Sequence, residues 1–174
     1  QQPLPHLPHP VAETGLVEPD HVTLAAIRAA GVEPAADALA WRSDPDASYL
    51  ARHAFDAAGL PPQVAAPHKP ANSGPVGDYS GVAVDQAYIG ACVGAKLEDL
   101  RMVAAILKGR RVAGGTRLLV APASQRAYRE AAADGTLQAI SEAGAYLLPT
   151  GCGACAALGA GILAENEVCI SSTN

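Results

Sequence analysis

Three cysteines have the spacing of a metal centre. Cys152 and Cys155 form a Cys-Gly-Ala-Cys motif, a spacing that lets two sulfurs face one centre. Cys92 lies 60 residues before Cys152; Gly90 and Gly94 flank Cys92, and Gly151 and Gly153 flank Cys152. Because the sequence shows no pattern of a secretion signal, we expect a cytoplasmic location, where cysteines serve metal binding or catalysis more often than disulfides.

The cysteines alone leave several kinds of chemistry open. Three thiolates suit a cubane iron–sulfur cluster with one iron lacking a protein ligand, since a cluster that only carries electrons usually has four. Such an iron can bind a substrate oxygen as a Lewis acid. Three cysteines with one histidine could instead hold structural zinc, and Cys-x-x-Cys could be a redox pair. The glycine-rich surroundings favour the cluster.

An alternation of apolar strands and helices after Gly81 predicts how these cysteines are positioned. We predict strands over 82–89, 117–121, 145–148 and 168–171, and helices over 97–108, 124–133 and 136–143. Strands alternating with helices indicate an α/β fold with a mostly parallel sheet. Because ligand sites gather where parallel strands end, the loops of Cys92 and Cys152 are expected to meet at one edge.

Other residues receive structural interpretations. Cys169 lies inside an apolar strand pattern and is interpreted as a buried core residue. Glu98 and Asp99 come at the start of the predicted helix 97–108, where acidic side chains stabilise the amino-terminal end.

The residues before Gly81 predict a shorter helical segment. Helices are expected over 21–30 after Asp20 and over 47–58 after Asp46, and the Pro-rich residues 1–10 are read as a linker. The Pro-rich residues 60–77 are predicted to be an extended connection, and the domain boundary falls within it.

Charge and hydropathy exclude two classes of partner. The formal net charge is -5, with no basic stripe, which argues against nucleic acid. The longest apolar runs are about half of what a bilayer span needs, so we expect no membrane partner.

Several motifs resemble the aconitase superfamily, and within it the large subunit of 3-isopropylmalate dehydratases. The similarity extends over about residues 11–174 in unbroken order. The motifs of the cysteine-bearing part are 85–92 (DQAYIGAC), 97–100 (LEDL), 105–109 (AILKG), 122–124 (PAS), 142–145 (EAGA), 151–155 (GCGAC) and 170–174 (ISSTN). Upstream, 17–20 (VEPD), 43–47 (SDPDA) and 62–65 (PQVA) fit the same family.

The resemblance implies an aconitase-like three-layer αβα fold preceded by a short helical segment. It divides the chain into residues 1–62, the end of a preceding aconitase-type domain plus linker, and residues 63–174, a cluster-bearing α/β domain incomplete at its carboxyl end. It also implies a [4Fe-4S] cluster held by Cys92, Cys152 and Cys155, and substrate binding by Asn174.

The activity implied by the resemblance is that of a hydro-lyase, which interconverts 2- and 3-isopropylmalate by dehydration and rehydration in leucine biosynthesis. Homoaconitase, aconitase or a substituted-malate dehydratase are the alternatives, all acting on a hydroxy di- or tricarboxylic acid. A non-enzymatic alternative is a three-cysteine zinc or iron-sensing protein. The catalytic base is expected on a small subunit or swivelling domain, with no catalytic residue in this chain.

Two departures from the family pattern stand out. After the first cluster cysteine the family usually has Thr-Asn-Gly, whereas this chain has Val93-Gly94-Ala95. The family's first large block is missing, so we expect an internal piece of a large subunit that is inactive alone.

Overall fold

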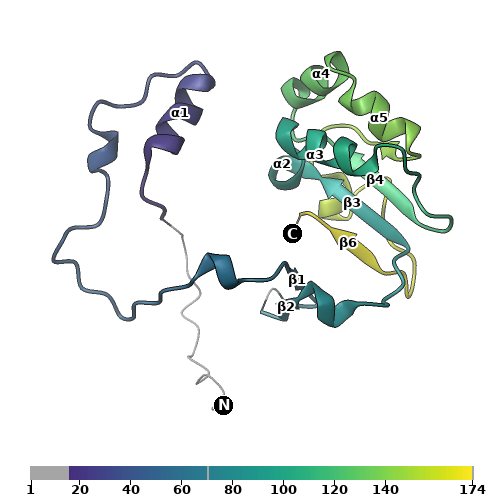
Figure 1. Ribbon diagram of the computed structural model, residues 1–174, viewed down its shortest axis with the longest axis horizontal. Helices are drawn as coiled ribbons and strands as arrows, with labels where there is room; N and C mark the ends of the chain where they lie inside the picture. Colours follow the sequence, from purple (N-terminus) through teal and green to yellow (C-terminus); the bar gives the residue numbers. More distant parts are fainter. Residues whose placement is uncertain (1–15, 70, 174) are drawn as a thin grey trace, which may run out of the picture. The chain divides into compact units, whose positions relative to one another are not determined.

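The computed structural model describes residues 16–69 and 71–173. The chain divides into two compact units after Leu60, and each unit is described by itself (Figure 1). None of the helices in the described ranges is long and apolar enough to cross a membrane.

The first unit contains one α-helix among its described residues, α1 (His21–Ala29). Asp20 caps it, because its carboxylate accepts a hydrogen bond from the backbone N–H of Thr23 at 2.7 Å. The predicted helix over 21–30 is therefore confirmed. Two short 3₁₀ turns follow, η1 (Ala38–Ala40) and η2 (Ala57–Gly59).

The predicted helix over 47–58 is wrong. Residues 47–56 are irregular, and only the 3₁₀ turn η2 forms at the end of this range. Leu50 is 98% exposed and Phe55 80% exposed, so the apolar residues that suggested a helix have no surface to pack against. A short helix gains most of its stability from such packing, and without it the capping residue Asp46 is insufficient.

The second unit begins with a small hairpin that the sequence did not predict. β1 (Gln63–Ala65) pairs antiparallel with β2 (Ser73–Pro75), with Val64 opposite Gly74. The 3₁₀ turn η3 (Val76–Tyr79) follows. The prediction of a wholly extended connection over 60–77 is corrected accordingly.

The described part of the second unit is built on a parallel four-stranded sheet, which confirms the α/β fold. Its strands run in the order β5-β4-β3-β6, and each neighbouring pair is parallel. The strands are β3 (Gln86–Gly90), β4 (Arg117–Ala121), β5 (Tyr146–Leu147) and β6 (Cys169–Ser171). β4 has the predicted bounds, whereas β3 begins later than predicted, and β5 and β6 are shorter.

Four α-helices of the described residues connect these strands: α2 (Ala91–Gly94), α3 (Leu97–Leu107), α4 (Gln125–Ala133) and α5 (Thr136–Glu142). Asp99 stabilises the start of α3 as predicted, since its carboxylate accepts the backbone N–H of Lys96 at 2.8 Å. Ser124 caps α4 by accepting the N–H of Ala127 at 3.1 Å. The helix predicted over 136–143 forms as α5, which begins at Thr136, and Gly135 precedes it with a φ of 82°.

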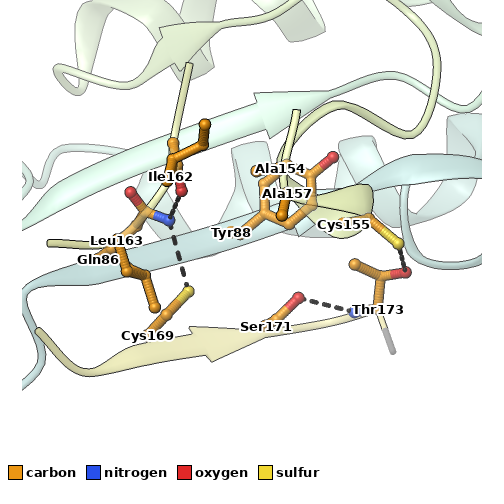
Figure 2. Close-up of a pocket in the computed structure, with 11 residues that line it drawn as sticks. Gln86, Tyr88, Ala154, Cys155, Ala157, Ile162, Leu163, Cys169, Ser171 and Thr173 are labelled. Carbon is orange, nitrogen blue, oxygen red and sulfur yellow. Dashed lines mark hydrogen bonds between the residues drawn. The ribbon is translucent and has the colours of Figure 1, made fainter. Parts of the chain in front are cut away.

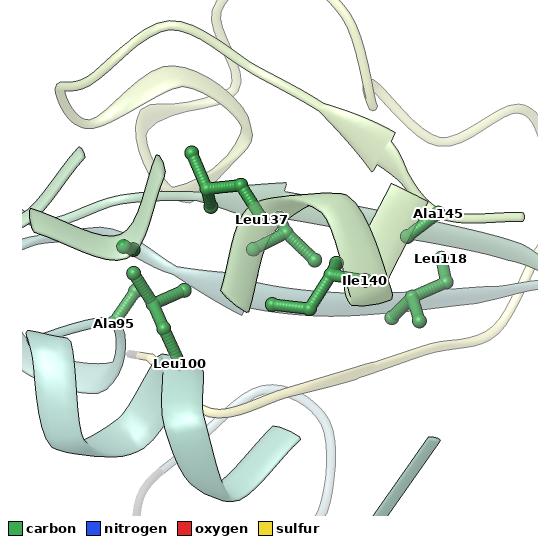
Figure 3. Close-up of a cluster of buried hydrophobic side chains, with 8 residues drawn as sticks. Ala95, Leu100, Leu118, Leu137, Ile140 and Ala145 are labelled. Carbon is green, nitrogen blue, oxygen red and sulfur yellow. The ribbon is translucent and has the colours of Figure 1, made fainter. Parts of the chain in front are cut away.

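The two faces of the sheet have different coverings. Gln86 and Tyr88 on β3 lie on the face that also carries Ala154 and Cys169 (Figure 2). Ala87 and Ile89 lie on the opposite face, where they pack against the main hydrophobic core. There Leu100 of α3 and Ile140 of α5 are fully buried with residues of β4 (Figure 3). The described residues thus supply the sheet and one helical layer.

Candidate functional site

Tyr88 connects the strand β3 to the second cysteine loop. Its side chain is only 2% exposed, and its phenolic O–H donates a hydrogen bond to the backbone carbonyl of Cys152 at 3.1 Å. The same carbonyl accepts the backbone N–H of Cys155 at 2.9 Å, which closes the turn of the Cys-Gly-Ala-Cys motif. One carbonyl oxygen therefore joins the motif to β3.

The three predicted ligand cysteines lie on two segments near Tyr88. Cys92 is in α2, directly after β3, whereas Cys152 precedes the 3₁₀ turn η4 (Gly153–Ala156) and Cys155 lies within it. All three are reduced thiols exposed to solvent. Burial raises the pKa of Tyr88 above its ordinary value, and negative charge on Cys155, Cys152 and Cys92 raises this pKa further. The three thiols thus act electrostatically on one phenol.

Two glycines make room for the Tyr88 ring. A Cβ at Gly90 would overlap the ring and its hydroxyl oxygen. Gly153 has a φ of 47°, which disfavours any side chain, and a Cβ there would lie 3.8 Å from the hydroxyl. Glycine is therefore favoured at position 90 because a side chain would overlap the Tyr88 ring, and at position 153 because the backbone is left-handed.

The end of β6 contacts both cysteine segments. Ser172 donates its backbone N–H to the Tyr88 carbonyl at 3.0 Å, and its hydroxyl oxygen accepts the N–H of Gly90 at 3.2 Å. The hydroxyl of the next residue, Thr173, lies 3.6 Å from the sulfur of Cys155. Asn174, predicted to bind substrate, lies outside the described residues.

A cavity of about 440 Å³ lies beside these contacts (Figure 2). Its wall includes Cys155 and Thr173 together with Tyr88, and its other side is formed by Gln86 and Cys169. Cys169, interpreted from the sequence as a core residue, is partly buried, and its sulfur lies 3.6 Å from the side-chain nitrogen of Gln86.

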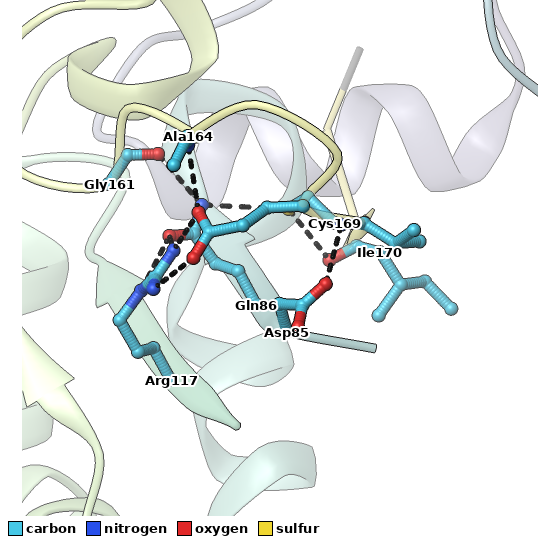
Figure 4. Close-up of polar contacts among 9 residues, drawn as sticks. Asp85, Gln86, Arg117, Gly161, Ala164, Cys169 and Ile170 are labelled. Carbon is cyan, nitrogen blue, oxygen red and sulfur yellow. Dashed lines mark hydrogen bonds and ion pairs between the residues drawn. The ribbon is translucent and has the colours of Figure 1, made fainter. Parts of the chain in front are cut away.

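A polar network holds the segment that follows the cysteine motif (Figure 4). Arg117 donates two hydrogen bonds of 2.7 Å to the two carboxylate oxygens of Glu167. These bonds, together with the backbone N–H of Ala164, lower the pKa of Glu167 to about 2. Arg117 also donates to the side-chain oxygen of Gln86, whose nitrogen donates to the Gly161 carbonyl at 2.8 Å. Residues 161–167 are thereby attached to β3 and β4.

Three cysteine thiols form a donor set that suits an iron–sulfur cluster. Among the residues that the structure describes, no group of three His, Cys, Asp or Glu side chains is arranged to hold a metal ion. A cubane cluster takes each thiolate on a separate iron, and soft thiolates are the ligands it prefers. The assignment of these three thiols as ligands stays a prediction.

Comparisons with known proteins identify the family of this chain. The sequence pattern of the aconitase family (aconitate hydratase) matches residues 75–174, which include all three cysteines. The chain belongs to the aconitase family. The match covers every strand of the parallel sheet.

Individual members of the aconitase family are similar over almost the whole chain. The 3-isopropylmalate dehydratase large subunit 1 of Methanopyrus kandleri is 42% identical over 164 residues, which are 94% of this chain and 38% of that protein. The probable methanogen homoaconitase large subunit of Methanosarcina mazei is 41% identical over 163 residues, 94% of this chain and 40% of that protein. The 3-isopropylmalate dehydratase large subunit 2 of Rubrobacter xylanophilus is 42% identical over 166 residues, which are 94% of this chain and 38% of that protein. The chain thus spans about two fifths of the length of these aconitase-family relatives.

Three residues of this aconitase-family site were not predicted from the sequence. Tyr88 and Gly90 lie on the same face of β3. Because alternate residues of a strand share a face, the sequence could have predicted this placement. Ser172 and Thr173 follow an apolar strand. Their contacts with the cysteine segments arise because β6 pairs with β3, and a local sequence pattern does not predict which strand β6 pairs with.

Proposed function

We propose that this chain carries the iron–sulfur site of a hydro-lyase that interconverts 2- and 3-isopropylmalate. The observation that carries the proposal is the hydrogen bond from the Tyr88 hydroxyl to the Cys152 carbonyl, which ties the Cys-Gly-Ala-Cys turn to the strand that leads into Cys92. Membership of the aconitase family and the names of the dehydratase relatives support the reaction class.

In this proposal Cys92, Cys152 and Cys155 hold a [4Fe-4S] cluster. When bound, the cluster offers an iron without a protein ligand, which polarises a substrate hydroxyl as a Lewis acid. The chain's own residues shape the place where this happens. Thr173 extends the end of β6 toward Cys155, and the adjoining Asn174 is proposed to bind a substrate carboxylate or hydroxyl.

The proton transfer is assigned to a partner. We infer that a small subunit or swivelling domain supplies the base that removes a proton from the carbon next to the hydroxyl. The expression "large subunit" in the names of the relatives supports such a partner. We place the protein in the cytoplasm, where thiols remain reduced.

Anaerobic reconstitution with iron and sulfide tests the cofactor. The 174-residue chain is expected to gain broad brown absorbance, and its Cys152→Ser variant is expected to lack this absorbance. Cys169→Ser is the matched control, since this cysteine lies on β6 and is not a proposed ligand, and it should keep the absorbance. Stoichiometric zinc without colour would contradict the proposal and favour the zinc-binding alternative.

A second candidate reaction is that of a homoaconitase. It is favoured by the 41% identity to the probable methanogen homoaconitase large subunit of Methanosarcina mazei. The holoenzyme, assembled with its small subunit, should be assayed with isopropylmalate, homocitrate and citrate. A kcat/KM highest for isopropylmalate supports the first proposal, and one highest for homocitrate supports the second.

A further inference from the structure

Tyr88 physically links the two segments that carry the three thiols. It lies on β3, the strand that leads directly into α2 with Cys92. Its hydroxyl donates to the Cys152 carbonyl, the oxygen that also closes the turn to Cys155. The phenol is therefore the side chain through which β3 holds the Cys-Gly-Ala-Cys turn.

The ring has little freedom to leave this position. It is almost fully buried, and the backbone of Gly90 lies directly against it. Leu119 and Ala121 on the neighbouring strand β4 belong to the same buried cluster. A side chain confined in this way keeps its hydroxyl at one place at little additional entropic cost.

The hydroxyl is the donor in this contact. A backbone carbonyl oxygen can only accept, so the phenolic O–H supplies the proton of the hydrogen bond to Cys152.

We propose that Tyr88 is a positioning residue for the iron–sulfur cluster: its phenolic O–H fixes the Cys152–Cys155 turn against the strand that carries Cys92. This inference rests on the proposed function. Tyr88 acts through the Cys152 carbonyl and is not itself a ligand. Without its hydroxyl, the turn keeps its internal hydrogen bond and the packing of Ala154 but loses its hydrogen bond to β3.

The first test uses the metal-free, 174-residue chain. Tyr88→Phe keeps the ring and removes only the hydroxyl, and Tyr146→Phe, at an exposed position on β5, is the matched control. We measure hydrogen exchange of the backbone N–H of Cys155, which is bonded to the Cys152 carbonyl, by mass spectrometry. A hydrogen bond of about 1 kcal/mol corresponds to about a fivefold change, so this N–H should exchange about fivefold faster in Tyr88→Phe.

The backbone N–H of Val112 serves as the internal reference in this experiment, because it is bonded to the Ala143 carbonyl at 2.8 Å beside the core on the other face of the sheet. Its rate should not change. Equal acceleration at Val112 would show that Tyr88 only stabilises the whole unit, and an unchanged rate at Cys155 would show that the hydroxyl positions nothing. Either result overturns the inference.

The second test measures retention of the reconstituted cluster. Visible absorbance in the presence of a chelator should decay about fivefold faster in Tyr88→Phe than in Tyr146→Phe, by the same hydrogen-bond arithmetic. Gly90→Ala, whose methyl group displaces the ring, should accelerate the decay as well. Equal decay in all variants overturns the inference and leaves the proposed function standing. A wild-type protein without a cluster refutes the proposed function, and the hydrogen-exchange rates then decide on the turn alone.

Discussion

The hydroxyl of Ser172 donates a hydrogen bond to the carbonyl oxygen of Gly94 at 3.2 Å, across the turn that carries Cys92. A Cβ at Gly94 would lie 2.5 Å from both the hydroxyl oxygen and the carbonyl oxygen of Ser172. Gly94 stands at one of the departures from the family pattern, where Asn is expected, and a side chain at this position would displace Ser172.

Gly94→Ala should therefore destabilise the second unit. Overpacking of this kind costs about 1–3 kcal/mol, because the backbone of Ser172 has to move. Urea unfolding measures the effect. Gly114→Ala is the control, since no atom lies within 4 Å of its Cβ position, and its free energy of unfolding should change by less than about 1 kcal/mol. Equal stability of Gly94→Ala and wild type would contradict the packing argument.

The Arg117–Glu167 pair predicts a pH dependence of stability. The pKa of Glu167 is about 2 in the folded protein, below the ordinary value of 4.5. A lowered carboxyl pKa stabilises the fold at pH values above 4.5, and this contribution is lost as the pH falls from 4.5 through about 2. Glu167→Gln should therefore lower the melting temperature at neutral pH, and the difference from wild type should shrink below pH 4.5.

Glu165→Gln is the control for this series, because Glu165 is an exposed acidic residue in the same segment. Its melting temperature should follow that of wild type throughout. A difference between Glu167→Gln and wild type that is the same at pH 7 and pH 3 would show that the carboxylate contributes nothing through its ionisation.

The core between α3 and the sheet should be sensitive to truncation. Leu100 is fully buried, and Leu100→Ala should cost about 2–5 kcal/mol because it leaves a cavity. Met102, on the same helix, is 63% exposed, so Met102→Ala should cost less than about 0.5 kcal/mol. Chemical denaturation of both variants compares the two positions directly. Similar losses for both would indicate that the face of α3 carrying Leu100 is not the packed one.

The elements around the sheet were predictable where local signals agreed with packing. α3, β4 and α4 form close to their predicted bounds, since their apolar periodicity, their caps and their burial indicate the same structure. The predicted helix over 47–58 failed because the sequence cannot state whether an apolar residue such as Leu50 meets a partner. Intrinsic propensity decides little without that packing.

The site was predictable in outline only. Strand ends in a parallel sheet share an edge, which anticipates that Cys92 and Cys152 lie on neighbouring segments. The roles of Tyr88 and Ser172 arise from tertiary contacts: one side chain crosses to a turn 64 residues away, and the other joins positions 82 residues apart. No local pattern encodes such contacts.

The pairing of β6 with β3 has a consequence for biogenesis. The ribosome delivers Cys92, Cys152 and Cys155 before it delivers Ser172, and the strand carrying Ser172 must return across 82 residues to reach Gly90. Long-range pairing of this kind forms late, because the intervening chain must first close. The contacts of Ser172 and Thr173 with the cysteine segments are therefore the last of the site to form. We expect a chain interrupted before β6 to keep the link from Tyr88 to the cysteine turn and to lack the contacts that close the site from the side of β6.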